Sequence, residues 1–145
     1  INNMVNSEKP VKSEDKEPEG KTEDEHKNHE YLFPDGILQD LYEQYNDLVF
    51  KRISSFEEFK NILTRDVHQE RLAECPNCKL MMYSILYSLQ QLLPDSTRKD
   101  WLNDIANECG YKVDIIEKKH TGNDASSEST KAKMEEIDEL FDEYR

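Results

Sequence analysis

One stretch of the chain, residues 78–93, restricts the fold more than any other. Ten apolar side chains lie between Leu80 and Leu93, and at helical spacing they cover most of the circumference of a helix. A helix that is apolar on nearly every side has to be covered by other helices, by a partner or by a ligand. The sequence therefore predicts that residues 78–93 form a helix at the centre of a bundle or against a binding partner.

Two segments before this helix show a related pattern. Over residues 36–50 and residues 56–73, apolar side chains recur every three or four positions, as on one face of a helix. Ser55 followed by Glu58 is a capping-box pattern, which is typical of the start of a helix. We therefore expect two amphipathic helices before the apolar one.

A fourth helix is expected after the turn at Pro94. Thr97 with Asp100 can cap its start, and Gly110 is typical of a left-handed helix end. Residues 111–116 alternate weakly and could form one extended segment, but a lone segment does not make a sheet. The sequence thus predicts an all-α fold, a small four-helix bundle over residues 31–116.

Composition separates the two ends of the chain from this domain. Residues 31–116 carry 40 apolar residues of 86, the usual share of a globular domain, whereas residues 1–30 carry four. So few apolar side chains cannot offset the entropy of ordering the backbone, so residues 1–30 are predicted to be a disordered acidic arm. Residues 117–130 are polar and are predicted to be a linker, followed by an amphipathic helix over residues 131–145.

The chain is strongly acidic, with 32 acidic residues against 19 Lys and Arg and a formal net charge of -13. Binding to nucleic acid or to anionic membranes depends on basic side chains, so neither is expected as a partner. No apolar stretch approaches the roughly 18 residues that a membrane span needs. A protein partner with a basic surface is favoured, because long-range attraction would steer it to the chain.

Three cysteines form the most distinctive local motif. Cys75 and Cys78 enclose Pro76 and Asn77, and Cys109 closes the fourth predicted helix. If the last two helices of the bundle pack antiparallel, Cys109 returns to within about one turn of the other two. A disulfide from Cys109 to Cys75 or Cys78 would then imply an oxidising compartment and secretion, leaving one thiol free or able to join two chains.

Other interpretations of the cysteines stay open. Cys109 with His68 or His120 could complete a zinc site, since Cys-x-x-Cys supplies half of one. A Cys-Pro-x-Cys pair at a helix start also occurs in redox dithiols, although the polar segment before it is not the buried strand found there. Three reduced, buried thiols in a cytoplasmic protein are the remaining alternative. No metal or cofactor is predicted.

From Cys75 through the apolar helix and the next helix to Cys109, about 35 residues of the chain resemble the N-terminal half of a saposin-like domain. In that family a CxxC pair opens the first helix and a third cysteine closes the second, about 30 residues later. This chain departs from the pattern because no cysteine follows Cys109 to form the second half. The resemblance implies a secreted carrier of lipids or other hydrophobic ligands, lined by Met81, Met82, Ile85 and Leu89.

Catalysis has little support in the sequence. The histidines are scattered, the acidic pairs fall in runs typical of solvated helix faces, and no nucleotide- or calcium-binding motif occurs. The sequence therefore predicts a non-enzymatic protein-interaction or inhibitory module that binds a basic partner surface. The alternative is the saposin-like carrier of hydrophobic ligands.

The segment 131–145 carries an apolar seam between acidic side chains. A helix of this length is marginal alone in water, so it has to dock in order to be ordered. It could dock on its own domain or in a groove of a partner. In the second case the partner-binding residues would be Met134, Ile137, Leu140, Phe141 and Tyr144.

Overall fold

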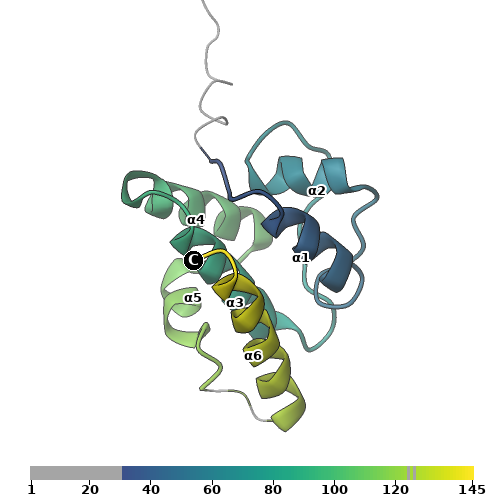
Figure 1. Ribbon diagram of the computed structural model, residues 1–145, viewed down its shortest axis with the longest axis vertical. Coiled ribbons are helices and arrows are strands. Elements are labelled where there is room, and N and C mark those ends of the chain that lie inside the picture. The colour runs from purple at the N-terminus through teal and green to yellow at the C-terminus, as the bar shows by residue number, and fades with distance from the viewer. Residues whose placement is uncertain (1–30, 124, 126) are drawn as a thin grey trace, which may run out of the picture. The chain divides into compact units, whose positions relative to one another are not determined.

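The computed structural model describes residues 31–123, 125 and 127–145, and these belong to one compact unit. Within these ranges the chain forms six α-helices and no strand, so the fold is all-α (Figure 1). The helices are α1 (Ile37–Tyr45), α2 (Phe56–Leu63), α3 (Lys79–Gln91), α4 (Asp95–Cys109), α5 (Val113–Lys119) and α6 (Glu128–Asp142). The acidic arm predicted over residues 1–30 lies outside the described residues.

Helix α3 is the central element of this unit. It packs against α4, α5 and α6 (Figure 1). Its apolar side chains, such as Met82, Leu86 and Leu89, are fully buried. The prediction that the apolar helix lies at the centre is therefore confirmed. The bundle has more helices than the four predicted over residues 31–116, because α5 begins at Val113 and α6 also packs on α3.

Helices α1 and α2 pack on each other beside this centre. The ring of Phe59 on α2 stacks on Phe50, which follows α1, with centroids 4.9 Å apart. Helix α1 ends earlier than the predicted residue 50, because Asn46 is extended and its side chain accepts a hydrogen bond from the Ile53 backbone N–H at 2.8 Å. The side chain of Asn46 thus fixes the turn that leads towards α2.

The helix predicted over residues 56–73 is shorter than expected. It begins as predicted, since the Ser55 side chain accepts a hydrogen bond from the Glu58 backbone N–H, but it ends at Leu63. Arg65 follows in the left-handed region with φ 62°, and the N–H groups of Arg65 and Asp66 bond back to the last turn of the helix. This is the Schellman arrangement that usually requires glycine, which is why the sequence did not reveal it.

The boundaries after α3 also differ from the predictions. Helix α4 starts at Asp95, so that Thr97 lies in its first turn rather than capping it, although Gly110 ends it in the left-handed region as predicted. Residues 113–119, part of which was expected to be extended, form α5. The predicted linker over residues 117–130 is shortened at both ends, because Ser127 caps α6 by accepting a hydrogen bond from the Thr130 N–H.

Helix α6 docks on its own domain. Its buried side chains lie against α3 and are Met134, Ile137, Leu140 and Phe141. Two hydrogen bonds join its end of the chain to α1: Tyr45 donates to Glu136 at 3.0 Å, and Tyr144 donates to Asp40 at 2.5 Å. No helix in the described part of the chain combines the length and the apolar character that crossing a membrane requires.

Candidate functional site

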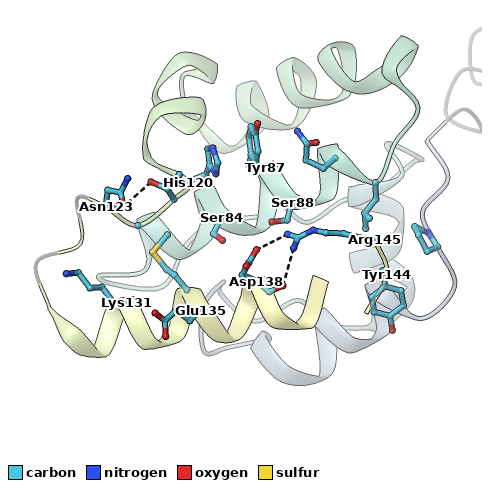
Figure 2. Close-up of a pocket in the computed structure, with 16 residues that line it drawn as sticks. Ser84, Tyr87, Ser88, His120, Asn123, Lys131, Glu135, Asp138, Tyr144 and Arg145 are labelled. Atoms are coloured by element: carbon cyan, nitrogen blue, oxygen red, sulfur yellow. Dashed lines mark hydrogen bonds and ion pairs between the residues drawn. The ribbon is translucent and has the colours of Figure 1, made fainter. Parts of the chain in front are cut away.

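A groove of about 980 Å³ lies beside the central helix (Figure 2). Its floor is α3, one wall is α6, and the segment between α5 and α6 closes one end. The side chains of Tyr144 and Arg145, together with Pro34, border the other end. Because α3 is otherwise covered by its neighbours, the groove exposes a part of the core helix to ligands.

Two serines form the floor of the groove. Ser84 and Ser88 are one helical turn apart on α3, and each is only 6% exposed. In the described part of the chain neither hydroxyl has a hydrogen-bond partner, and both lie opposite Asp138 across the groove (Figure 2). Neither hydroxyl oxygen is among the fully buried unpaired atoms of the described residues, so both are open to the groove and can bond a polar group that enters it.

An aromatic pair stands at the side of the groove near α5. The ring of His120 stacks on Tyr87 with centroids 3.6 Å apart and an interplanar angle of 6°. Burial lowers the pKa of His120, and Glu117 opposes this only in part. The imidazole is therefore neutral at pH 7, and the pair offers a flat and uncharged surface.

The facing wall carries charged groups from α6. Lys131, Glu135 and Asp138 are spaced so that they share one face of the helix and line the groove. Gly122, with φ 82°, lets the preceding segment approach this wall, because a Cβ there would lie 2.9 Å from the sulfur of Met134. The close approach defines the narrow end of the groove.

Arg145 lies at the opposite end of the groove, and its guanidinium pairs with two carboxylates of α6. Its Nη2 lies 2.9 Å from Oδ1 of Asp138, and its Nη1 bonds the carboxylate of Asp142 (Figure 2). Nη1 also donates to the Asp138 backbone carbonyl at 3.5 Å. Burial acts to lower the pKa of Arg145, but these two acids outweigh it and raise the pKa. The groove therefore already holds one guanidinium.

The apolar residues predicted to contact ligands or partners mostly lie in the core. Met81, Met82, Ile85 and Leu89, expected to line a cavity for hydrophobic ligands, are buried, and none of them lines this groove. Among the residues predicted to anchor α6 on a partner, Ile137, Leu140 and Phe141 are buried in the domain. Met134 and Tyr144 are the two that also line the groove.

The predicted disulfide from Cys109 to Cys75 or Cys78 is not formed, and all three thiols are free. Helices α3 and α4 do pack on each other, but the thiols face different neighbours: Cys78 donates to the Leu48 carbonyl at 3.5 Å, while Cys109 is half-buried near Glu108. The inference of secretion from this bond therefore has no support in the structure.

The cysteines also lack the electrostatic surroundings of reactive or metal-binding thiols. Burial raises the pKa of Cys109 to about 12, and burial also raises the pKa of Cys75 and of Cys78. A thiolate, not a thiol, is the nucleophile and the zinc ligand. Moreover, no group of three His, Cys, Asp or Glu side chains that could hold a metal ion occurs among the described residues.

Serine, histidine and carboxylate side chains share the groove, which raises the question of a catalytic triad. A nucleophilic serine is activated by a hydrogen bond to its base. Within the described ranges no hydrogen bond joins Ser84 or Ser88 to His120, whose ring instead lies flat on Tyr87. In the described residues these side chains are therefore not arranged as a nucleophile hydrogen-bonded to its base.

No family model matches the chain, and no curated protein or solved structure shows significant similarity to it. These comparisons neither support nor oppose the saposin-like resemblance of residues 75–109.

Sequence reasoning missed the groove because its residues come from segments far apart along the chain. One signal was present, since Ser84 and Ser88 are the only small polar residues inside the apolar run and they are four positions apart. That spacing puts both on one face of the helix and leaves a hollow between larger neighbours.

Proposed function

We propose that this chain is a non-enzymatic interaction module that binds a basic segment of a partner protein in the groove between α3 and α6. The observation that carries the proposal is the pair of serines, Ser84 and Ser88, which are 6% exposed, have no hydrogen-bond partner in the described part of the chain and face Asp138 of α6. Hydroxyls can bond the backbone or side chain of an extended peptide, and the carboxylates supply the complementary charge.

The surface around the groove supports a basic partner. Apart from its buried seam and its two lysines, the exposed face of α6 is mostly acidic and carries Glu128, Glu135, Glu136, Asp138, Glu139 and Asp142. With the net charge of -13, this face would attract a basic protein over a Debye length of about 8–10 Å. The same charge repels nucleic acid and anionic lipid.

The size of the groove supports a short peptide segment. Its volume of about 980 Å³ lies at the upper end of the range for small-molecule sites, and it is open to solvent along α6. A few residues of an extended chain fit such a groove, with alternate side chains directed to the floor and to the α6 wall, where Glu135 and Asp138 lie.

The test is the binding of labelled model peptides measured by fluorescence anisotropy. Peptides of four Lys-Ala repeats and of four Arg-Ala repeats should bind the full chain, more weakly at 150 mM than at 50 mM salt, and four Glu-Ala repeats should not. Ser88→Leu should block binding by filling the groove, whereas Ser96→Leu, on the exposed face of α4, should leave it unchanged. Thermal melting of both variants checks that they are folded.

Two results would overturn the proposal. The first is basic-peptide binding that is unaffected by Ser88→Leu or by salt. The second is lipid retained by the purified chain in native mass spectrometry, since that would favour the saposin-like carrier.

A further inference from the structure

We infer that the groove recognises arginine in preference to lysine. The guanidinium of Arg145 occupies the site beside Asp138 and Asp142, here called the arginine position, until an arginine of the partner displaces it. This inference rests on the proposed function, because it names the side chain by which the basic segment is recognised. The occupant is an extended segment of a partner protein that carries at least one arginine.

The contacts of Arg145 define the position. Its two terminal nitrogens reach three acceptors: the Asp138 carboxylate at 2.9 Å, the Asp138 carbonyl at 3.5 Å and the Asp142 carboxylate. The acceptors belong to successive turns of α6, at Asp138 and Asp142. A planar guanidinium with five N–H groups can reach all three at once, whereas a lysine ammonium is a compact point charge.

The Arg145 side chain can leave this position at low cost. Its side chain is 35% exposed, and those of Asp138 and Asp142 are 61% and 62% exposed. Ion pairs as exposed as these favour the closed arrangement by only about two- to fivefold. An incoming arginine would form the same contacts, and its peptide would add bonds to the hydroxyls of Ser84 and Ser88.

The buried serines separate this site from an ordinary acidic helix face. Each is more than nine-tenths buried, and neither has a hydrogen-bond partner in the described part of the chain. They lie across the groove from Asp138 (Figure 2). A peptide whose arginine reaches Asp138 would therefore lay its neighbouring polar groups over Ser84 and Ser88.

The experiment compares the Arg-Ala and Lys-Ala repeat peptides on the wild type and on Arg145→Ala. We expect the arginine peptide to bind about threefold to tenfold more tightly than the lysine peptide to the wild type. Arg145→Ala should tighten arginine-peptide binding by about two- to fivefold, because the position is then vacant. Asp138→Asn should weaken it by about tenfold.

Matched controls separate position from net charge. Arg52→Ala removes an exposed arginine outside the groove, and Asp114→Asn neutralises an exposed acid on α5. Both should change binding by less than twofold. A second readout is the Nε–H resonance of Arg145, which should move towards the value of an unpaired arginine when the arginine peptide saturates the chain.

The outcomes distinguish this inference from the proposed function. If neither peptide binds, or Ser88→Leu leaves binding intact, the proposed function fails and the inference fails with it. If both peptides bind equally, Ser88→Leu blocks both and Arg145→Ala has no effect, the groove function stands and the arginine inference is overturned. An Arg145 resonance that does not move on saturation would overturn it as well.

Discussion

The imidazole of His120 lies flat on the ring of Tyr87, with centroids 3.6 Å apart and planes 6° from parallel. The two residues belong to different segments, so the contact joins the end of α5 to α3 at the rim of the groove. A neutral ring suits this stack, because burial penalises the imidazolium.

Acidification should therefore weaken the domain through His120. The pKa of His120 in the folded chain is lowered below the ordinary value of 6.5. The contribution of the neutral imidazole to the free energy of unfolding is therefore complete above pH 6.5 and is lost as the pH falls below it. The loss should stay below about 1 kcal/mol, because the ring is partly exposed. Urea denaturation at pH 7.5 and pH 5.5 measures it.

The variant His120→Asn removes this titration and should reduce the difference between the two pH values. His29→Gln, at a histidine outside the described residues, is the control. An unchanged pH difference in His120→Asn would show that His120 is not the group responsible.

A second polar cluster, outside the groove, joins α4 to the loop after α2. Arg65 pairs with Glu108 at 2.7 Å and with Asp104 at 3.0 Å, and His68 lies 3.0 Å from the same Glu108 oxygen. Burial acts to raise the pKa of Glu108, but the hydrogen bonds from Arg65 and His68 outweigh it and keep the pKa below its ordinary value. The stabilisation is therefore present above about pH 4.5 and is lost as the pH falls below it.

Glu108→Gln should lower the free energy of unfolding by about 1–3 kcal/mol, because it leaves the Arg65 guanidinium, which is 10% exposed, without its closest carboxylate. Asp104→Asn is the matched control, since it removes the other partner of Arg65 but is 55% exposed. It should cost less than about 1 kcal/mol. Equal costs for the two variants, measured by urea denaturation at pH 7, would contradict this account.

The buried indole of Trp101 gives a third prediction. Its Nε1–H donates to the carbonyl of Leu63 at 2.7 Å, and because Leu63 is the last residue of α2, that carbonyl has no donor within its own helix. Trp101→Phe should lower the free energy of unfolding by about 2–4 kcal/mol, because it removes the hydrogen bond to Leu63 and leaves a small cavity in the core.

Tyr42→Phe is the comparison for this hydrogen bond. Tyr42 donates to the Ile53 carbonyl at 2.9 Å, but the Asn46 side chain also donates to that oxygen, at 3.3 Å. The carbonyl therefore keeps a partner, and the variant should cost less than about 1.5 kcal/mol. A larger cost for Tyr42→Phe than for Trp101→Phe would show that the buried bond to Leu63 has little weight.

The helical class and the central helix could be predicted because both depend on local patterns. The apolar face predicted for the first helix comprised seven residues. Five of them, Ile37, Leu38, Leu41, Tyr45 and Val49, are buried, whereas Tyr42 is half-buried and Leu48, beyond the end of α1, is 63% exposed. The cap at Ser55 and the stop at Gly110 depend on side chains within a few residues, and both formed as expected. Such signals act over one or two helical turns, which a sequence displays directly.

The missed features depend on contacts between distant residues. The loop after α2 is held because the N–H groups of Gln69 and Glu70 donate hydrogen bonds to the Glu58 carboxylate, at 2.5 Å each, whereas residues 67–73 alone look like a continuing helix. The groove joins Ser84, His120 and Asp138, which the packing of α5 and α6 on α3 brings together. Spacing along the chain carries no record of either arrangement.

The last prediction concerns the docking of α6. Phe141 is fully buried in the core that α6 shares with α3, so α6 should belong to the same cooperative unit as the central helix. Phe141→Ala should lower the free energy of unfolding by about 3–5 kcal/mol, whereas Glu139→Ala, on the exposed face of α6, should change it by less than about 0.5 kcal/mol.

Because domains of this size have only about 5–15 kcal/mol of stability, Phe141→Ala could fail to fold, and Ile137→Val then serves in its place with an expected cost of about 0.5–1.5 kcal/mol. Urea denaturation followed by tryptophan fluorescence is a direct measurement, because Trp101 lies on α4 and not on α6. If the unfolding transition reported by Trp101 fluorescence has the same urea midpoint in Phe141→Ala and Ile137→Val as in the wild type, α6 unfolds independently of the core. If peptide binding is lost in those same variants, the apolar seam of α6 would be the recognition element rather than a part of the domain.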